Sequence, residues 1–239
     1  MGALTPVFLF LLFLSANSDE SSKLDSSCFP AIPISNSVAA LYVFGDSTVD
    51  AGNNNYVHKA ARANSLPYGI DFNNTPTGRF TNGKTIADFI AILYNLSLPP
   101  PYLSLTEAQR KTAMDGINYA SAGCGPLGCL PSVKNKTGNG QCDEQMNQNI
   151  MPYNSQLPQT LKNIQDEYPD ATLTLANSHD LLHDILADTE KYDVKDPRCG
   201  TYVNGELACI PNSTPCDNRC QYLFFDASHT GEFANCIFV

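Results

Sequence analysis

Apolar residues along the chain follow two alternating patterns, short runs and helical spacings. The run from Ala39 to Phe44 predicts a buried strand, and the segments Gly116–Ala120 and Ala171–Leu175 predict two more. Apolar residues spaced i, i+3, i+4, i+7 or close to it predict three helices, marked by Ile86, Phe89, Ile90 and Leu93, by Leu157, Leu161, Ile164 and Tyr168, and by Leu181, Leu182, Ile185 and Leu186. Strands that alternate with helices are typical of an α/β fold with a parallel sheet.

Two segments are too rich in turn-forming residues for long helices or strands. Residues 53–83 are dense in Asn, Gly, Pro and Thr, which predicts a surface loop that shapes a cleft beside Ser47. Asn82 or Thr81 is expected near the cap of the helix that follows this loop. Residues 198–221 combine Cys, Pro and Asn, which predicts a second loop held in order by disulfides. We find no internal repeat and no second domain.

The composition limits the classes of protein to which the chain can belong. The 239 residues suit a single domain, and 43% hydrophobic residues suffice for a core. Fourteen basic residues against 24 acidic ones give a net charge of −10. This balance disfavours nucleic acid as a partner, and no basic patch is interleaved with aromatic residues.

The N-terminus carries an apolar run from Val7 to Leu14, followed by the small residues Ala16 and Ser18. This pattern predicts a secretory signal at residues 1–18, a polar arm at 19–38 and one folded domain at 39–239. The alternative, a membrane anchor, needs roughly 20 apolar residues, and the polar stretch from Asn17 ends the run early. We therefore expect a secreted, extracellular protein with no stable membrane span.

Cysteines and sequons agree with secretion. Nine cysteines suit an oxidising compartment, although an odd number cannot all pair within one molecule. The alternative is a zinc site formed by Cys199, Cys209, Cys216 and Cys220 with His229, but the chain has no Cys-x2-Cys knuckle, so we expect no metal. N-glycosylation sequons begin at Asn73, Asn95, Asn135 and Asn212.

The candidate chemistry comes from opposite ends of the chain. The first predicted strand leads into a small-residue turn that carries Ser47, and Asp226 lies three residues before His229 near the C-terminus. A serine hydroxyl becomes nucleophilic only beside a base, so the three residues together predict a Ser-His-Asp site. The alternatives are a capping serine at position 47 and a surface histidine at position 229. Asp46 is expected to be a structural cap and not a catalyst.

The segment Phe44–Tyr56 resembles the first block of the plant GDSL esterase/lipase family, a branch of the SGNH hydrolases. The likeness continues through residues 67–72, 76–89, 116–123, 126–131 and 226–229, and so covers nearly all of the mature chain. The resemblance implies a three-layer, flavodoxin-like α/β fold with a parallel sheet. It also implies hydrolysis of ester or acyl-lipid substrates by Ser47, His229 and Asp226, without cofactor or metal.

One family feature has no counterpart in the chain. In the family, a long segment with a Gly-x-Asn-Asp motif separates the second block from the Pro-Leu-Gly-Cys-Leu-Pro stretch, but here the two meet at Gly125-Pro126. By resemblance, the amides of Ser47 and Gly123 form the oxyanion hole, with Gly125 as the alternative to Gly123. The third donor, the motif's asparagine, has no matching residue. We therefore expect an internally deleted form that lacks one or more elements of the sheet.

Three hypotheses follow for the function of this form. The first is a secreted serine esterase or lipase, slowed about 100- to 1000-fold by the loss of one oxyanion donor. The second is an acyl- or ester-binding protein that does not turn over. The third is a non-functional truncation product, because a sheet that loses an internal strand exposes apolar faces and unpaired edges.

Overall fold

The computed structural model describes residues 41–113, 118–169, 172–188, 209–217, 219 and 222–239. The predicted signal at residues 1–18 and the arm at 19–38 lie outside the described residues. So does much of the predicted loop at 198–221, with two of the four cysteines of the zinc alternative, Cys199 and Cys220.

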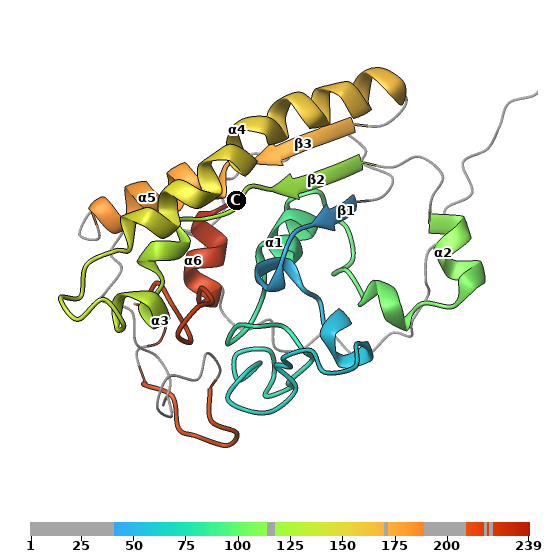
Figure 1. The fold of residues 1–239 in the computed structure, drawn as a ribbon. Helices are drawn as coiled ribbons and strands as arrows, with labels where there is room; N and C mark the ends of the chain where they lie inside the picture. Colours follow the sequence, from blue (N-terminus) through green and yellow to red (C-terminus); the bar gives the residue numbers. More distant parts are fainter. Residues whose placement is uncertain (1–40, 114–117, 170–171, 189–208, 218, 220–221) are drawn as a thin grey trace, which may run out of the picture.

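A three-stranded parallel sheet forms the frame of the described α/β fold (Figure 1). It consists of β1 (Leu41–Phe44), β2 (Asn118–Ala122) and β3 (Thr172–Ala176), in that order across the sheet. The three predicted strands are confirmed, although β2 lies two residues later than predicted. Among the described residues, only β2 has a strand on both sides.

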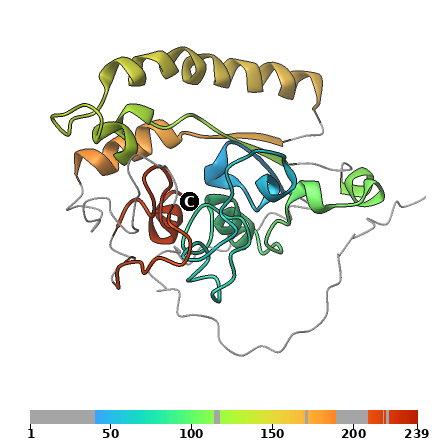
Figure 2. The same ribbon diagram turned by 60° about the horizontal axis from the view of Figure 1, so that its bottom comes forward.

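Helices lie on both sides of this sheet. Figures 1 and 2 show α4 along β3 on one side, and α1 and α6 on the other. The helices are α1 (Ile86–Leu93), α2 (Glu107–Ala113), α3 (Pro131–Lys134), α4 (Glu144–Glu167), α5 (Ser178–Ala187) and α6 (Glu232–Ile237). Within the described residues, short 3-10 helices join them: η1 (Ser47–Val49), η2 (Asn53–Tyr56), η3 (Tyr102–Ser104) and η4 (Leu127–Cys129). The sequence predicted α1, α5 and the second half of α4, but missed α2, α3 and α6, which are short.

Helix α1 begins at a capping box. The Thr85 hydroxyl accepts the Asp88 amide at 3.3 Å, and the Asp88 carboxylate accepts the Thr85 amide at 2.8 Å. The prediction of a cap near Asn82 or Thr81 was wrong. The Asn82 side chain instead accepts the Glu232 amide at 2.8 Å, a contact across 150 residues that sequence spacing does not reveal.

A buried ion pair ties α1 to the loop before it. Arg79 makes two hydrogen bonds to Asp88, at 2.7 and 2.8 Å, and the side chains are 6% and 0% exposed. The same guanidinium donates to the carbonyls of Ala51 and Pro99. One charged group therefore holds together the segment after η1, the loop, α1 and the segment before η3.

Helix α4 has no buried residue and contacts the rest of the protein along one face. Leu157 and Leu161 on this face are partly buried, as the apolar spacing predicts. Ile164 and Tyr168, predicted to share the stripe, are 40% and 57% exposed, so that part of the prediction was wrong.

Three amide side chains complete the inner face of α4, and we call them the amide stripe: Asn147, Asn154 and Gln165. Asn147 accepts the Gly128 amide at 2.8 Å, and Gln165 accepts the Leu173 amide of β3 at 2.9 Å. Asn154 both accepts from and donates to the backbone of Cys124, each at 2.8 Å. The helix therefore docks largely by satisfying backbone groups and less by burying apolar surface.

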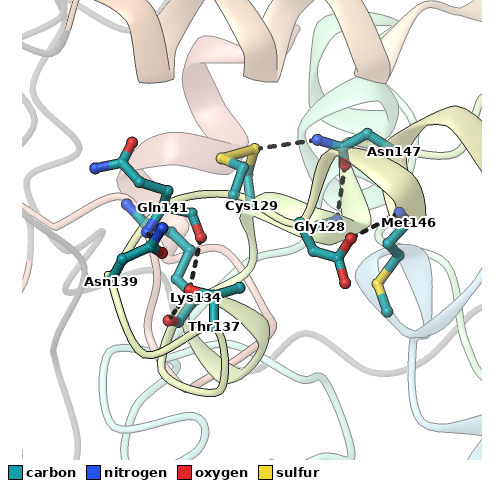
Figure 3. Close-up of a disulfide and its surroundings, with 10 residues drawn as sticks. Gly128, Cys129, Lys134, Thr137, Asn139, Gln141, Met146 and Asn147 are labelled. Atoms are coloured by element: carbon teal, nitrogen blue, oxygen red, sulfur yellow. Dashed lines mark hydrogen bonds between the residues drawn. A yellow bond between two sulfur atoms is a disulfide. The ribbon is translucent and has the colours of Figure 1, made fainter.

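A disulfide fixes the start of α4 (Figure 3). Cys129 of η4 is bonded to Cys142, just before the N-cap Asp143, and Asn147 donates to the Cys129 sulfur. A bridge with a sequence separation of 13 stabilises a fold by about 3 kcal/mol through loop-closure entropy. Cys216 is disulfide-bonded as well.

The core is divided into small clusters, each of which contains or contacts residues of the C-terminal segment. One contains Ala63, Tyr68, Phe80, Cys209 and Phe225, and another packs α5 against Leu223, Phe224 and Ala234. The third joins Val49 to Ile86 and Ala87 of α1. At the end of β1, by contrast, Phe44 is 54% exposed, as expected for a sheet that has lost covering elements.

We predict that Arg79→Met lowers the free energy of unfolding by about 3–5 kcal/mol, because it leaves the Asp88 carboxylate buried without its cation. Lys162→Met is the matched control, since Lys162 pairs with Asp166 on an exposed helix face, where both side chains are more than 60% exposed. That loss is expected to stay below about 1 kcal/mol. Urea unfolding followed by circular dichroism measures both, and equal losses would contradict the prediction.

Candidate active site

Ser47 lies in η1, directly after the turn that ends β1. Asp46 caps this turn, since its carboxylate accepts the Thr48 amide at 2.9 Å and the Thr48 hydroxyl at 2.7 Å. The prediction that Asp46 is a structural cap is therefore confirmed. Both contacts use Asp46 Oδ1, so this carboxylate orders the backbone directly after Ser47.

The segment after Ser47 is ordered by a second carboxylate. Asp50 is 8% exposed and accepts the backbone amides of Gly52, Asn53 and Asn54. Gly52 has φ +118°, and an added Cβ would lie 2.5 Å from the Thr77 carbonyl oxygen, so only glycine fits here. The Asp-Ala-Gly-Asn-Asn sequence thus folds locally into the η1–η2 turn that holds Ser47 in place.

The structure brings the three predicted site residues together from opposite ends of the chain. The Ser47 Oγ lies 2.7 Å from His229 Nε2, and His229 Nδ1 lies 2.7 Å from Asp226 Oδ2. Because a carboxylate accepts only, Nδ1 carries the proton in the neutral imidazole, and Nε2 accepts from the serine hydroxyl. This tautomer lets the histidine act as a base toward Ser47.

Asp226 is fully buried, and four donors surround its carboxylate. Oδ1 accepts the backbone amides of Ser228 and His229 at 2.8 and 2.7 Å, which folds residues 226–229 into a tight turn. Oδ2 accepts His229 Nδ1 and the Tyr68 hydroxyl, the latter at 2.6 Å. Buried charges are tolerated only when they are paired or hydrogen-bonded in this way.

The imidazole is held from a second direction by an aromatic ring. Phe80 lies with its ring centroid 4.7 Å from that of His229, at an interplanar angle of 33°. Phe80 and Tyr68 both come from the loop predicted to line the site, but no role was predicted for either. The signal available in the sequence was the presence of four aromatic residues, these two among them, in a turn-rich, polar loop.

Polar contacts join this loop to the C-terminal segment, and we call them the loop–C-terminal interface. The main residues are Asp71, Asn82 and Lys84 on the loop side and Arg219, Glu232 and Asn235 on the other. Lys84 pairs with Glu232 at 3.1 Å, and Arg219 with Asp71. This interface sets where His229 lies, because both chain segments converge on the site.

The predicted oxyanion hole is only partly available. The Gly123 amide donates to the Ala176 carbonyl at 2.9 Å, where β2 and β3 run on into their loops. It is therefore not free to bind an oxyanion in this conformation, contrary to expectation. Among the hydrogen bonds of the described residues, none uses the amides of Ser47 or Gly125 as donors.

Other predicted features are placed as follows. Asn73, Asn95, Asn135 and Asn212, which begin the four sequons, are all exposed. His179 and His183 stack on α5 with centroids 6.4 Å apart, far along the chain from the three site residues. Within the described ranges, no group of three or more His, Cys, Asp or Glu residues is arranged to hold a metal ion.

In the same ranges, none of the helices has both the length and the apolar composition needed to cross a bilayer.

Comparison with known proteins finds relatives across most of the chain. No family model matches it. The chain is similar to GDSL esterase/lipase At1g71691 of Arabidopsis thaliana, at 28% identity over 84% of this chain and 80% of the relative. It is similar to GDSL esterase/lipase 7 of the same species, at 29% identity over 82% and 85%. A shorter match to GDSL esterase/lipase At2g04020 is 48% identical and covers 50% of this chain and 37% of that protein.

The alignments also reveal a gap. The first runs over 310 residues, although 84% of a 239-residue chain supplies only about 200 of them, so about 110 aligned positions have no residue here. The second, over 311 residues, shows the same excess. The relatives thus carry internal sequence that this chain lacks, in agreement with the expected internal deletion.

We predict that Glu232→Gln removes a pH dependence from the stability of the loop–C-terminal interface. Burial raises the pKa of the Glu232 carboxyl above its ordinary 4.5, against the opposing effect of Lys84. A carboxyl group whose pKa is higher in the folded protein than in the unfolded chain stabilises the fold below about pH 4.5. This stabilisation is lost as the pH rises through the pKa of the folded protein.

The melting temperature of the parent, relative to Glu232→Gln, should therefore fall as the pH rises from about 4.5 towards neutrality. Differential scanning fluorimetry across this range measures the difference. A difference that is constant with pH, or that grows in the parent's favour, would contradict the assignment.

Proposed function

Because the chain belongs to the plant GDSL esterase/lipase family, we propose that it hydrolyses carboxylic esters, with Ser47 as nucleophile, His229 as general base and Asp226 as the residue that orients the base. The observation that carries this proposal is the continuous hydrogen-bonded chain from Ser47 Oγ through His229 to Asp226, with both links at 2.7 Å. The relatives' names support ester substrates, including acyl lipids.

The arrangement supports a two-step reaction. Ser47 Oγ attacks the ester carbonyl carbon while His229 Nε2 takes the hydroxyl proton, and the imidazolium then gives this proton to the departing alkoxide. Water next attacks the acyl-serine, again losing a proton to Nε2, and the carboxylic acid leaves as the serine is regenerated. The buried Asp226 carboxylate stabilises the imidazolium in both steps, and no cofactor or metal is needed.

The rate of this form is expected to be low. A tetrahedral intermediate needs preorganised donors, and each missing donor typically costs about 100- to 1000-fold in turnover. Here the asparagine of the missing block is absent, and the Gly123 amide is occupied by Ala176. The Ser47 amide, with Gly125 as a second candidate, is what remains to bind the oxyanion.

We extend the proposal to the fold and the location of the protein. The three parallel strands with helices on either side support a reduced version of the three-layer, flavodoxin-like SGNH fold. The apolar leader at residues 1–18, the exposed sequon asparagines and the disulfides support a secreted glycoprotein, with the hydrolase domain beginning near residue 39.

The test is fluorophosphonate labelling of the secreted, purified protein, with the modified residue mapped by mass spectrometry. We expect labelling at Ser47 alone, and we expect Ser47→Ala to abolish both labelling and esterase activity. Asp46→Asn is the matched control, since it alters the neighbouring carboxylate while keeping an acceptor for Thr48; its labelling should match that of the parent.

Two outcomes would reject the enzymatic proposal. Labelling that persists in Ser47→Ala would assign the reactivity to another residue. A cooperatively folded parent that neither labels nor hydrolyses p-nitrophenyl acetate and butyrate would leave the acyl-binding hypothesis, which ligand binding unaffected by Ser47→Ala would support.

A further inference from the structure

Tyr68 is a buried side chain that the proposed reaction does not yet use. It is 1% exposed, and its hydroxyl donates to Asp226 Oδ2 at 2.6 Å. The same hydroxyl accepts the Cys209 amide at 3.1 Å. With one donor and one acceptor contact, the direction of its O–H bond is fixed toward the carboxylate.

The Tyr68 ring is held by the aromatic residues that surround the site. Phe225, next to Asp226, packs edge-on against it with centroids 5.7 Å apart, and Phe80 does so at 6.1 Å. Phe80 also lies against the imidazole of His229. A shift of the Tyr68 ring would therefore disturb both members of the Asp226–His229 pair.

The hydroxyl stays a donor over the working pH range. Burial, and next the negative charge of Asp226, raise the pKa of Tyr68 well above its ordinary value of 10. Burial likewise raises the pKa of Cys209 to about 12, so its thiol is also neutral. Near Ser47, burial raises the pKa of the Cys124 thiol, and the negative charge of Asp46 raises it further.

We propose that Tyr68 is a positioning residue of the hydrolytic site, whose hydroxyl shares Asp226 Oδ2 with His229 Nδ1 and so fixes the carboxylate and moderates the charge that it presents to the imidazole. The inference rests on the proposed function for its catalytic meaning. Its geometric part, a hydroxyl acting on the Asp226–His229 hydrogen bond, can be tested independently of turnover.

Tyr68→Phe should change the chemistry in a specific direction. Without the hydroxyl, Oδ2 has only His229 Nδ1 as a donor, so more of its charge stabilises the protonated imidazole. The acid limb of the kcat/KM profile should therefore move to higher pH by about one unit, since a hydrogen bond to a charged group changes an equilibrium by about tenfold or more. With the carboxylate less fixed, kcat should fall about tenfold at an unchanged KM for a small ester.

The experiment combines pH profiles for p-nitrophenyl acetate with proton NMR of the His229 Nδ1–H, the far-downfield resonance of an imidazole proton bound to a carboxylate. Tyr68→Phe is compared with Thr85→Val, which removes another buried hydroxyl, at the cap of α1, without touching Asp226. Thr85→Val should lower the melting temperature while leaving the profile and the resonance where they are.

The outcomes separate the inference from the proposed function. A displaced resonance in Tyr68→Phe supports the inference even if the parent shows no turnover, a result that would reject only the enzymatic proposal. An unmoved resonance together with an unmoved profile, in a folded variant of lower stability, would reduce Tyr68 to a packing residue and overturn the inference.

A second measurement covers the case in which Tyr68→Phe fails to fold. Incorporation of 3-fluorotyrosine makes the phenol a stronger donor and keeps the ring in place. Tyr68 is the tyrosine that donates to Asp226 among the described residues, so the His229 resonance should move opposite to the shift expected on losing the hydroxyl. No movement would again overturn the inference.

Discussion

The buried carboxylate of Asp226 is the group on which the site depends. A charge with no exposed surface is stable only if its oxygens are saturated with donors, and here two backbone amides, an imidazole and a phenol supply them. The two amides come from the turn of Asp226 itself, whereas the phenol comes from Tyr68, 158 residues away. The requirement to satisfy one carboxylate thus joins the C-terminal turn to the long loop, and it fixes His229 opposite Ser47.

This dependence explains how a site can persist in a chain that lacks internal sequence found in its relatives. The loop, η1, α1 and the C-terminal segment interlock through the Arg79–Asp88 pair, the loop–C-terminal interface and two small apolar clusters. The sheet contributes β1 as the support for Ser47, and Val43 of this strand packs against the cluster of Val49, Ile86 and Ala87. At the end of β1, Phe44 is exposed, and the Gly123 amide donates to the Ala176 carbonyl of β3.

Local patterns in the sequence predicted the strands and helices α1 and α5, because apolar periodicity is a short-range property. The three site residues were predicted from the Ser47 turn and the Asp226–His229 spacing together with the family resemblance. These patterns failed where contacts with residues far along the chain determine the structure. Helix α1 is capped by Thr85 and not by Asn82, whose side chain accepts the Glu232 amide. Ile164 and Tyr168 are exposed, since α4 docks through the side-chain amides of Asn154 and Gln165. Tyr68 and Phe80 were missed as contributors to the site because their partners, Asp226 and His229, lie some 150 residues further on.

The amide stripe of α4 and the loop–C-terminal interface use different kinds of polar group. Neutral amides respond little to ionic strength, whereas salt weakens the partly exposed ion pairs Lys84–Glu232 and Arg219–Asp71. The amide stripe and the loop–C-terminal interface therefore respond differently to ionic strength. Concentrated salt weakens the ion pairs around the base while leaving the amide contacts of α4 intact, so that in such conditions the protein loses the alignment of Ser47 and His229 before its secondary structure melts.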